Sequence, residues 1–129
     1  MKLLSIEGFK NILLCDLCQK DIRNLYNGHP ESHGYSKWLD RNLNLLDHSM
    51  IYDLLHLKQF EPLSGHENIY SIRRPESKGN PRVLFFTIIE TNAEPLYILL
   101  TAFHEHNSGD YKNAIKVAEA RKKTIMNLI

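Results

Sequence analysis

The sequence predicts an α+β fold: an antiparallel sheet meander with N-terminal helices packed on one face and a C-terminal helix. Two observations lead to this prediction. Apolar residues recur at helical spacing in the first half of the chain, and near Asn68 the spacing changes to the alternation of strands. Beyond Asn107 the helical spacing returns. Helices, then consecutive strands, then a helix is an order typical of an α+β domain.

The first half should hold a short strand followed by helices. Asn27-Gly28-His29-Pro30 is a strong stop signal after the first helical stretch. Asp47-His48-Ser49 ends the second stretch, and Ser49 is a good N-cap for a third. The expected elements are a strand over residues 1–6 and helices over residues 9–26, 35–46 and 50–57.

The second half should hold three strands and one helix. The strands are expected over residues 68–73, 82–90 and 96–103, because β-branched and aromatic residues are frequent there and the connecting residues 75–81 and 91–95 are typical of turns. Asn107-Ser108-Gly109-Asp110 then opens a last helix that runs to about Leu128.

Composition and charge exclude several classes of protein. The chain has 129 residues, 43% hydrophobic and 24% charged, which fits one globular domain rather than a disordered or fibrous chain. No apolar run reaches the roughly 20 residues of a membrane helix, and no secretory leader is recognisable. Two cysteines provide no disulfide framework, so a cytoplasmic setting is expected. The net charge is only +1, although residues 73–129 hold nine Lys and Arg against six Asp and Glu.

A zinc site is one hypothesis for the N-terminal region. Two thiolates and two imidazoles can complete a tetrahedral zinc site. Cys15 and Cys18, then His29 and His33, have acceptable spacings within each pair, but the gap between the pairs is short. Because the cysteines fall within the first expected helix, burial as small apolar residues is the alternative.

His104-Glu105-His106 follows the third expected strand. Histidines two apart on a strand point to the same face, and imidazole is the side chain whose ordinary pKa lies closest to neutral pH. The pair is therefore a candidate for proton transfer. Exposed histidines without a function are the other interpretation.

Three arginines flank the turn between the first two strands. Arg73 and Arg82 would lie side by side in an antiparallel hairpin, with Arg74 next to them. Two guanidinium groups suit a phosphate, because each offers a planar fork of donors. In a meander these arginines and His104 share one edge of the sheet. Arginines for charge, histidines for protons and Tyr111 nearby would form a phosphodiester-cleaving site that needs no cofactor if the nucleophile is the 2′-OH of RNA.

The second half resembles the RelE/HigB toxin superfamily of bacterial type II toxin–antitoxin pairs, within the wider RelE/ParE group. The similarity covers about residues 36–124, so residues 36–129 are interpreted as the toxin domain and residues 1–35 as an N-terminal extension of the same domain. The residues that carry the resemblance are Leu63-x-Gly65, Ile69-Tyr70-Ser71-Ile72-Arg73, Pro81-Arg82-Val83-Leu84-Phe85-Phe86, Ile98-Leu99-Leu100-Thr101-Ala102-Phe103, Ala114 to Ala118, and Arg121.

The resemblance implies a ribosome-dependent mRNA endonuclease (an mRNA interferase) of bacterial or phage origin, neutralised by a cognate antitoxin that is expected to be a helix-turn-helix protein. Its partners would be the ribosome and mRNA, and no membrane would be involved. The residues expected to take part in catalysis are Arg73, Arg82, His104, His106 and Tyr111. Those expected to bind RNA are Arg74, Lys78 and Lys112.

Two departures separate the chain from the family pattern. The usual Phe-x-Lys-Lys reads Phe103-His104-Glu105-His106, so both lysines are absent, and Ser71 replaces the usual acidic residue. Because some members use a histidine after this strand as the proton donor, His104 is the expected donor. The alternatives are a non-cleaving or gyrase-directed relative on the same fold, or a zinc-stabilised interaction domain.

Overall fold

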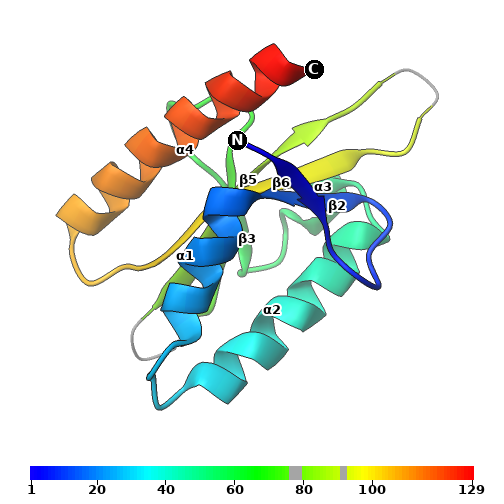
Figure 1. Ribbon diagram of the computed structural model, residues 1–129. Coiled ribbons are helices and arrows are strands. Elements are labelled where there is room, and N and C mark those ends of the chain that lie inside the picture. The colour runs from blue at the N-terminus through cyan, green and yellow to red at the C-terminus, as the bar shows by residue number, and fades with distance from the viewer. Residues whose placement is uncertain (76–79, 91–92) are drawn as a thin grey trace.

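A computed structural model describes residues 1–75, 80–90 and 93–129 and shows helices packed around one sheet (Figure 1). The α+β class is confirmed. The helices are α1 (Asp16–Tyr26), α2 (Ser32–Asp47), α3 (Ile51–Leu54) and α4 (Ser108–Leu128). The strands are β1 (Leu3–Ser5), β2 (Ile12–Cys15), β3 (Phe60–Pro62), β4 (Tyr70–Arg73), β5 (Pro81–Ile88) and β6 (Leu96–His104). None of the helices in the described part of the chain is long and apolar enough to cross a membrane.

The sheet is mixed, which differs from the predicted antiparallel meander. Its six strands run in the order β1-β2-β6-β5-β4-β3. Consecutive strands β4, β5 and β6 pair antiparallel as expected, but β2 pairs with β6 in parallel. Strands β1 and β2, from the N-terminal residues, thus extend the sheet that the strands of the second half form.

The first expected helix, over residues 9–26, was wrong in its first part. Residues 12–14 pair with residues 97–99 of β6, and both Ile12 and Cys15 are fully buried. The helix begins only at Asp16, with Cys15 as its N-cap: the Cys15 sulfur accepts a hydrogen bond from the backbone N–H of Cys18. A short apolar run fits a strand or a helix equally well, and here the pairing partner lies far along the chain.

Three smaller differences follow the first. The third helix covers only Ile51–Leu54 rather than residues 50–57. Strand β3 was not predicted, and it pairs antiparallel with β4 at the sheet edge. Asn68 lies before β4 rather than within a strand, because its backbone has φ 54°. Its side chain bonds the backbone of Thr87: the amide nitrogen donates to O at 2.7 Å, and the amide oxygen accepts from N–H at 3.1 Å.

Helix α1 directly follows β2 and runs beside β6. Cys15 donates its S–H to the Leu100 carbonyl, and further along α1 the Leu25 carbonyl lies 3.3 Å from Nε2 of His104. Helices α2 and α4 pack against opposite faces of the sheet, since Tyr35 of α2 contacts His104 while Tyr111 of α4 contacts its neighbour Phe103. The end of β6 is therefore covered on both faces.

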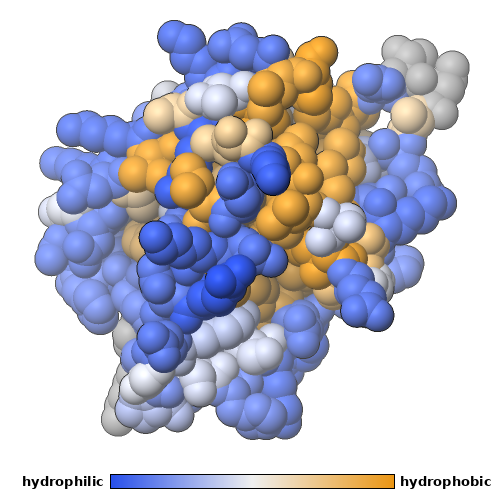
Figure 2. Space-filling model, viewed as in Figure 1, coloured by the Kyte–Doolittle hydropathy of each residue, from blue (hydrophilic) through white to orange (hydrophobic). Residues whose placement is uncertain are grey.

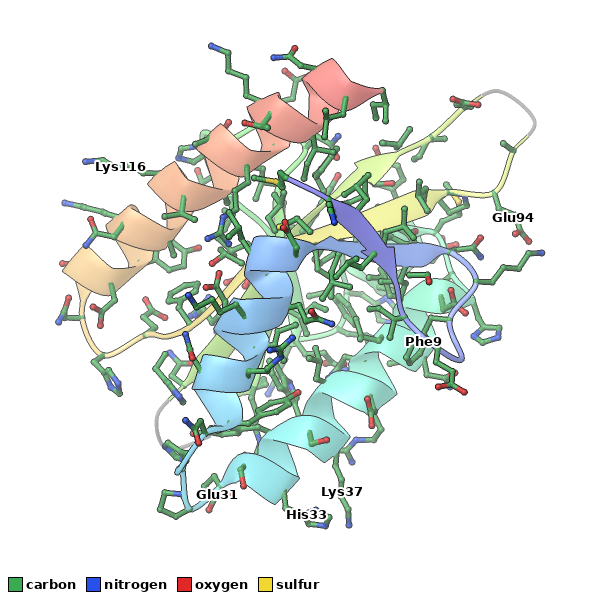
Figure 3. All side chains as sticks on the ribbon, viewed as in Figure 1. Phe9, Glu31, His33, Lys37, Glu94 and Lys116 are labelled. Atoms are coloured by element: carbon green, nitrogen blue, oxygen red, sulfur yellow. The ribbon has the colours of Figure 1, made fainter. Side chains whose placement is uncertain are left out.

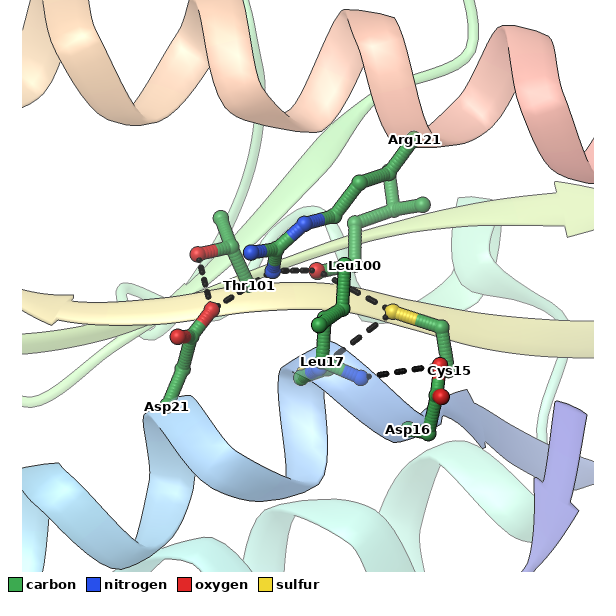
Figure 4. Close-up of polar contacts among 8 residues, drawn as sticks. Cys15, Asp16, Leu17, Asp21, Leu100, Thr101 and Arg121 are labelled. Atoms are coloured by element: carbon green, nitrogen blue, oxygen red, sulfur yellow. Dashed lines mark hydrogen bonds and ion pairs between the residues drawn. The ribbon is translucent and has the colours of Figure 1, made fainter. Parts of the chain in front are cut away.

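Arg121 fastens α4 to the rest of the molecule (Figure 4). Its Nη1 donates to the Leu100 carbonyl at 2.8 Å and to Asp21 of α1 at 2.6 Å, and Asp21 also accepts from the Thr101 hydroxyl at 2.8 Å. This ion pair supplements a narrow apolar contact, because the buried residues of α4 are only Ala114, Ala118 and Ile125.

Polar and apolar surfaces separate on the face drawn in Figure 2. Apolar residues gather in the region where Figure 1 places the two chain ends. Met1, Leu128 and Ile129, at those ends, are exposed. Polar residues cover the opposite end, where α1 leads into α2. The candidate functional residues lie toward that polar end.

Candidate functional site

Arg73 and Arg82 face each other across β4 and β5. They are direct partners in the antiparallel register, so their side chains leave the same face of the sheet. Phe103 of β6 is the next partner of Arg82 in the same row. The Nε of Arg73 donates to the Lys58 carbonyl at 2.7 Å, and this hydrogen bond restrains the Arg73 side chain. The side-by-side placement predicted from the hairpin is present.

Arg82 is held between two carboxylates. Its Nη1 donates to Oε1 of Glu61 at 2.6 Å, and its Nε lies 2.6 Å from Oε2 of Glu105. The second contact is an ion pair without hydrogen-bond geometry. The Arg82 side chain is 10% exposed, against 36% for Glu61 and 22% for Glu105. The guanidinium is thus fixed and nearly covered, and Glu61 is the more accessible of its two partners.

Tyr111 completes this group from α4. Its ring lies against the Arg82 guanidinium, with 5.2 Å from the central carbon to the ring centroid, and its centroid is 6.2 Å from that of Phe103. Burial raises the pKa of the Tyr111 phenol, while Arg82 and Arg73 act in the opposite direction. The hydroxyl therefore keeps its proton at neutral pH. We refer to Arg73, Arg82, Glu61, Glu105 and Tyr111 as the arginine cluster.

Sequence reasoning missed the two carboxylates of the arginine cluster. Glu61 lies on the unpredicted strand β3, directly opposite Ser71, so it leaves the same face as Ser71 and Arg73. The neighbouring strand thus brings a carboxylate next to Ser71. Glu105 lies between the two histidines already singled out, and strand alternation alone could have assigned it to the face of Arg82.

The histidines lie on the other face. His104 follows Phe103 in β6, so it points away from Arg82, and its ring centroid is 5.7 Å from that of His106. The shared face predicted for these two residues is present. His104 also stacks on His29 at 5.0 Å and lies 5.4 Å from Tyr35. We refer to His29, His104 and His106 as the histidine column.

The three residues expected to bind RNA have different surroundings. Arg74 belongs to the face of the histidine column, where it pairs with Glu31 at 3.5 Å and lies over the Tyr35 ring at 5.5 Å. Lys112 is exposed on α4, one residue after Tyr111. Lys78 lies outside the described residues.

The four residues of the zinc hypothesis do not meet. Cys15 and Cys18 are buried at the start of α1, where burial raises the pKa of both thiols. His29 and His33 lie beyond the other end of this 11-residue helix, which is about 16 Å long. Across residues 1–75, 80–90 and 93–129, no group of three or more His, Cys, Asp or Glu side chains is arranged to hold a metal ion.

The arginine cluster combines three kinds of group useful for phosphoryl chemistry. Two guanidinium groups can neutralise a phosphate, a carboxylate can take a proton, and a protonated phenol can give one. The catalytic residues predicted from the sequence are divided between two faces of the sheet: Arg73, Arg82 and Tyr111 lie on one face, and the two histidines lie on the other. Comparisons with models of protein families, with curated proteins and with solved structures give no match.

Proposed function

We propose that this protein is the toxin of a type II toxin–antitoxin pair and cleaves mRNA on the ribosome. The observation that carries the proposal is the direct pairing of Arg73 with Arg82 beside Glu61 and Tyr111. The RelE/HigB resemblance supplies the ribosome and the antitoxin, and the geometry supports the cleavage chemistry. No cofactor is required for the reaction proposed.

The reaction is a transfer within the RNA chain. The 2′-OH oxygen attacks the adjacent phosphorus, and the bond from phosphorus to the 5′ oxygen breaks. One product ends in a 2′,3′-cyclic phosphate and the other begins with a 5′-OH. Arg73 and Arg82 stabilise the charge that develops on the phosphate oxygens, which is worth about 10²–10³ in rate for a preorganised donor.

Glu61 is the proposed general base. It is the more exposed of the two carboxylates on Arg82, so a ribose can reach it. Glu105 is more restrained, because its Oε2 also accepts from Asn80 Nδ2 at 2.9 Å and its backbone N–H donates to the Asn80 carbonyl. We assign Glu105 the task of positioning Arg82.

Tyr111 is the proposed proton donor to the leaving 5′ oxygen. Its phenol is protonated at neutral pH, since burial raises its pKa, and the ring lies against Arg82. The family resemblance implies His104 for this role. Since His104 faces α2 rather than Arg82, we move the donor role to Tyr111 and leave the histidines a role in binding.

The antitoxin should act by closing the arginine cluster. Arg82 already binds two carboxylates, which shows that acidic groups fit beside it. An antitoxin segment that carries a carboxylate could take the place of the RNA phosphate at Arg73. Growth arrest by the chain alone, relieved by a cognate neighbour-encoded protein, is the expected behaviour.

Cleavage of a reporter mRNA with purified ribosomes tests the proposal. We expect cuts that depend on the ribosome and leave 2′,3′-cyclic phosphate and 5′-OH ends, which end-labelling distinguishes from 3′-OH and 5′-phosphate ends. Absence of cutting with and without ribosomes would refute it. That outcome would favour a non-cleaving relative, for which the closed ion pairs of Arg82 and the two missing family lysines are the supporting observations.

A further inference from the structure

The histidine column is a stack of three nearly parallel rings, one from residue 29 and two from the residues at and after the end of β6. His104 is the middle ring: its centroid is 5.0 Å from that of His29, with 18° between planes, and 5.7 Å from that of His106, with 17°. His29 comes from the connection between α1 and α2, and His106 from the residues after β6. Such a stack presents a flat π surface at its free end.

The inner rings of the column are fixed by hydrogen bonds. The Nδ1 of His29 accepts from the backbone N–H of Glu31 at 3.0 Å, so the ring proton is on Nε2, which donates to the Tyr35 hydroxyl oxygen at 3.3 Å. The Nε2 of His104 lies 3.3 Å from the Leu25 carbonyl. His29 and His104 are half-buried, whereas His106 is exposed. The column is therefore preformed, with His106 as its outer ring.

A basic groove begins beside the inner end of the column. It has a volume of about 830 Å³, and Asn27 and Gly28, which precede His29, form part of its wall. Lys20, Arg23 and His33 also line it, and no acidic side chain does within the described residues. His33 and the exposed Lys37 project from the same end of α2 (Figure 3). The groove suits an anionic chain.

We propose that the histidine column and this groove form a binding site for single-stranded nucleic acid, in which an unpaired base stacks on His106 and the phosphates follow Lys20 and Arg23. Stacking platforms joined to a basic groove are the general means of holding single strands, because every base has a π face. The choice of RNA as the natural ligand rests on the proposed function. The stacking itself does not depend on the sugar.

The position of the column connects it to the arginine cluster. His104 is the register partner of Pro81, and the next pair along the two strands is Phe103 with Arg82. The column and the cluster thus occupy the same end of the sheet on opposite faces. A strand that passes around this end can place a phosphate at Arg82 and a neighbouring base on His106, so the site would select unpaired over paired RNA.

Fluorescence anisotropy with an uncleavable probe tests the site. The probe is a labelled 2′-O-methyl heptaadenylate, which lacks the 2′-OH nucleophile, and the protein is the full chain. We expect His106→Ala to weaken binding about 5- to 150-fold, the range for loss of one base stack. His106→Trp should restore binding, since it replaces one aromatic face with another. His56→Ala is the matched control, because His56 is an exposed histidine outside the column, and it should bind as the wild type does.

Two results would overturn the inference: His106→Ala binding as tightly as the wild type, or the wild type binding an abasic chain of the same length as tightly as the heptaadenylate. The test is separate from that of the proposed function. A protein that binds through His106 but cuts no mRNA keeps this site and refutes the nuclease. A protein that cuts mRNA without any effect of His106→Ala on binding keeps the nuclease and refutes this site.

Discussion

The two faces at one end of the sheet differ in kind. The arginine cluster joins charged groups at 2.6 Å and keeps the Arg82 guanidinium nearly covered. The histidine column joins three imidazole rings by stacking and leaves its outer ring exposed. The first set holds opposite charges in a fixed place, and the second exposes one aromatic ring. Consecutive residues of β6 divide between them, because alternate side chains of a strand leave opposite faces.

The largest expected effect concerns the general base. Glu61→Gln keeps an oxygen that accepts from Arg82 but removes the proton acceptor, so single-turnover cleavage on the ribosome should fall about 10²–10⁴-fold. Glu90→Gln is the matched control, since Glu90 is an exposed carboxylate two residues beyond the far end of β5, and it should cut normally. If Glu61→Gln cuts normally and Glu105→Gln is slow, the roles of the two carboxylates are reversed.

The two arginines should separate catalysis from stability. Arg73→Gln and Arg82→Gln should each lower the single-turnover rate about 10²–10³-fold. Only Arg82→Gln leaves two carboxylates without their cation, so it should lower the free energy of unfolding more than Arg73→Gln does, by about 3 kcal/mol or less given that both carboxylates are partly exposed. Denaturant unfolding beside the cleavage assay measures both effects. Loss of stability with full activity in Arg82→Gln would give Arg82 a structural role only.

The pH profile distinguishes a phenol donor from an imidazole donor. Tyr111 must be protonated to act, and its pKa is raised, so its contribution should persist up to its ordinary value of 10.0 and decline only above it. An imidazole donor with the ordinary pKa of about 6.5 would already lose rate above neutral pH. Tyr111→Phe should cut about 10²-fold more slowly and lack the alkaline decline. A wild-type rate that falls between pH 6 and 8 would return the donor role to a histidine.

The sequence predicted that the candidate residues gather at one end of the sheet but not that they are divided between its two faces. The turn between residues 73 and 82 fixes a hairpin, so the pairing of the two arginines followed from spacing alone. The position of Glu61 was not predicted, because its strand, Phe60–Pro62, is only three residues long and contains a proline, which is not typical of strands. The contact of His29 with His104 was not predicted, because it depends on α1 running beside β6. That arrangement follows from the parallel pairing of β2 with β6, of which residues 12–15 give no local sign.

The most direct measurement is single-turnover cleavage at varied mRNA–ribosome concentration for Arg73→Gln and His106→Ala. The central claim is that the arginine cluster performs the reaction and the histidine column holds the substrate. Arg73→Gln should therefore lower the saturating rate about 10²–10³-fold. His106→Ala should leave that rate near the wild-type value and raise the half-saturating concentration about 5- to 150-fold. A saturating rate reduced more by His106→Ala than by Arg73→Gln would contradict the claim and place the chemistry on the histidine face.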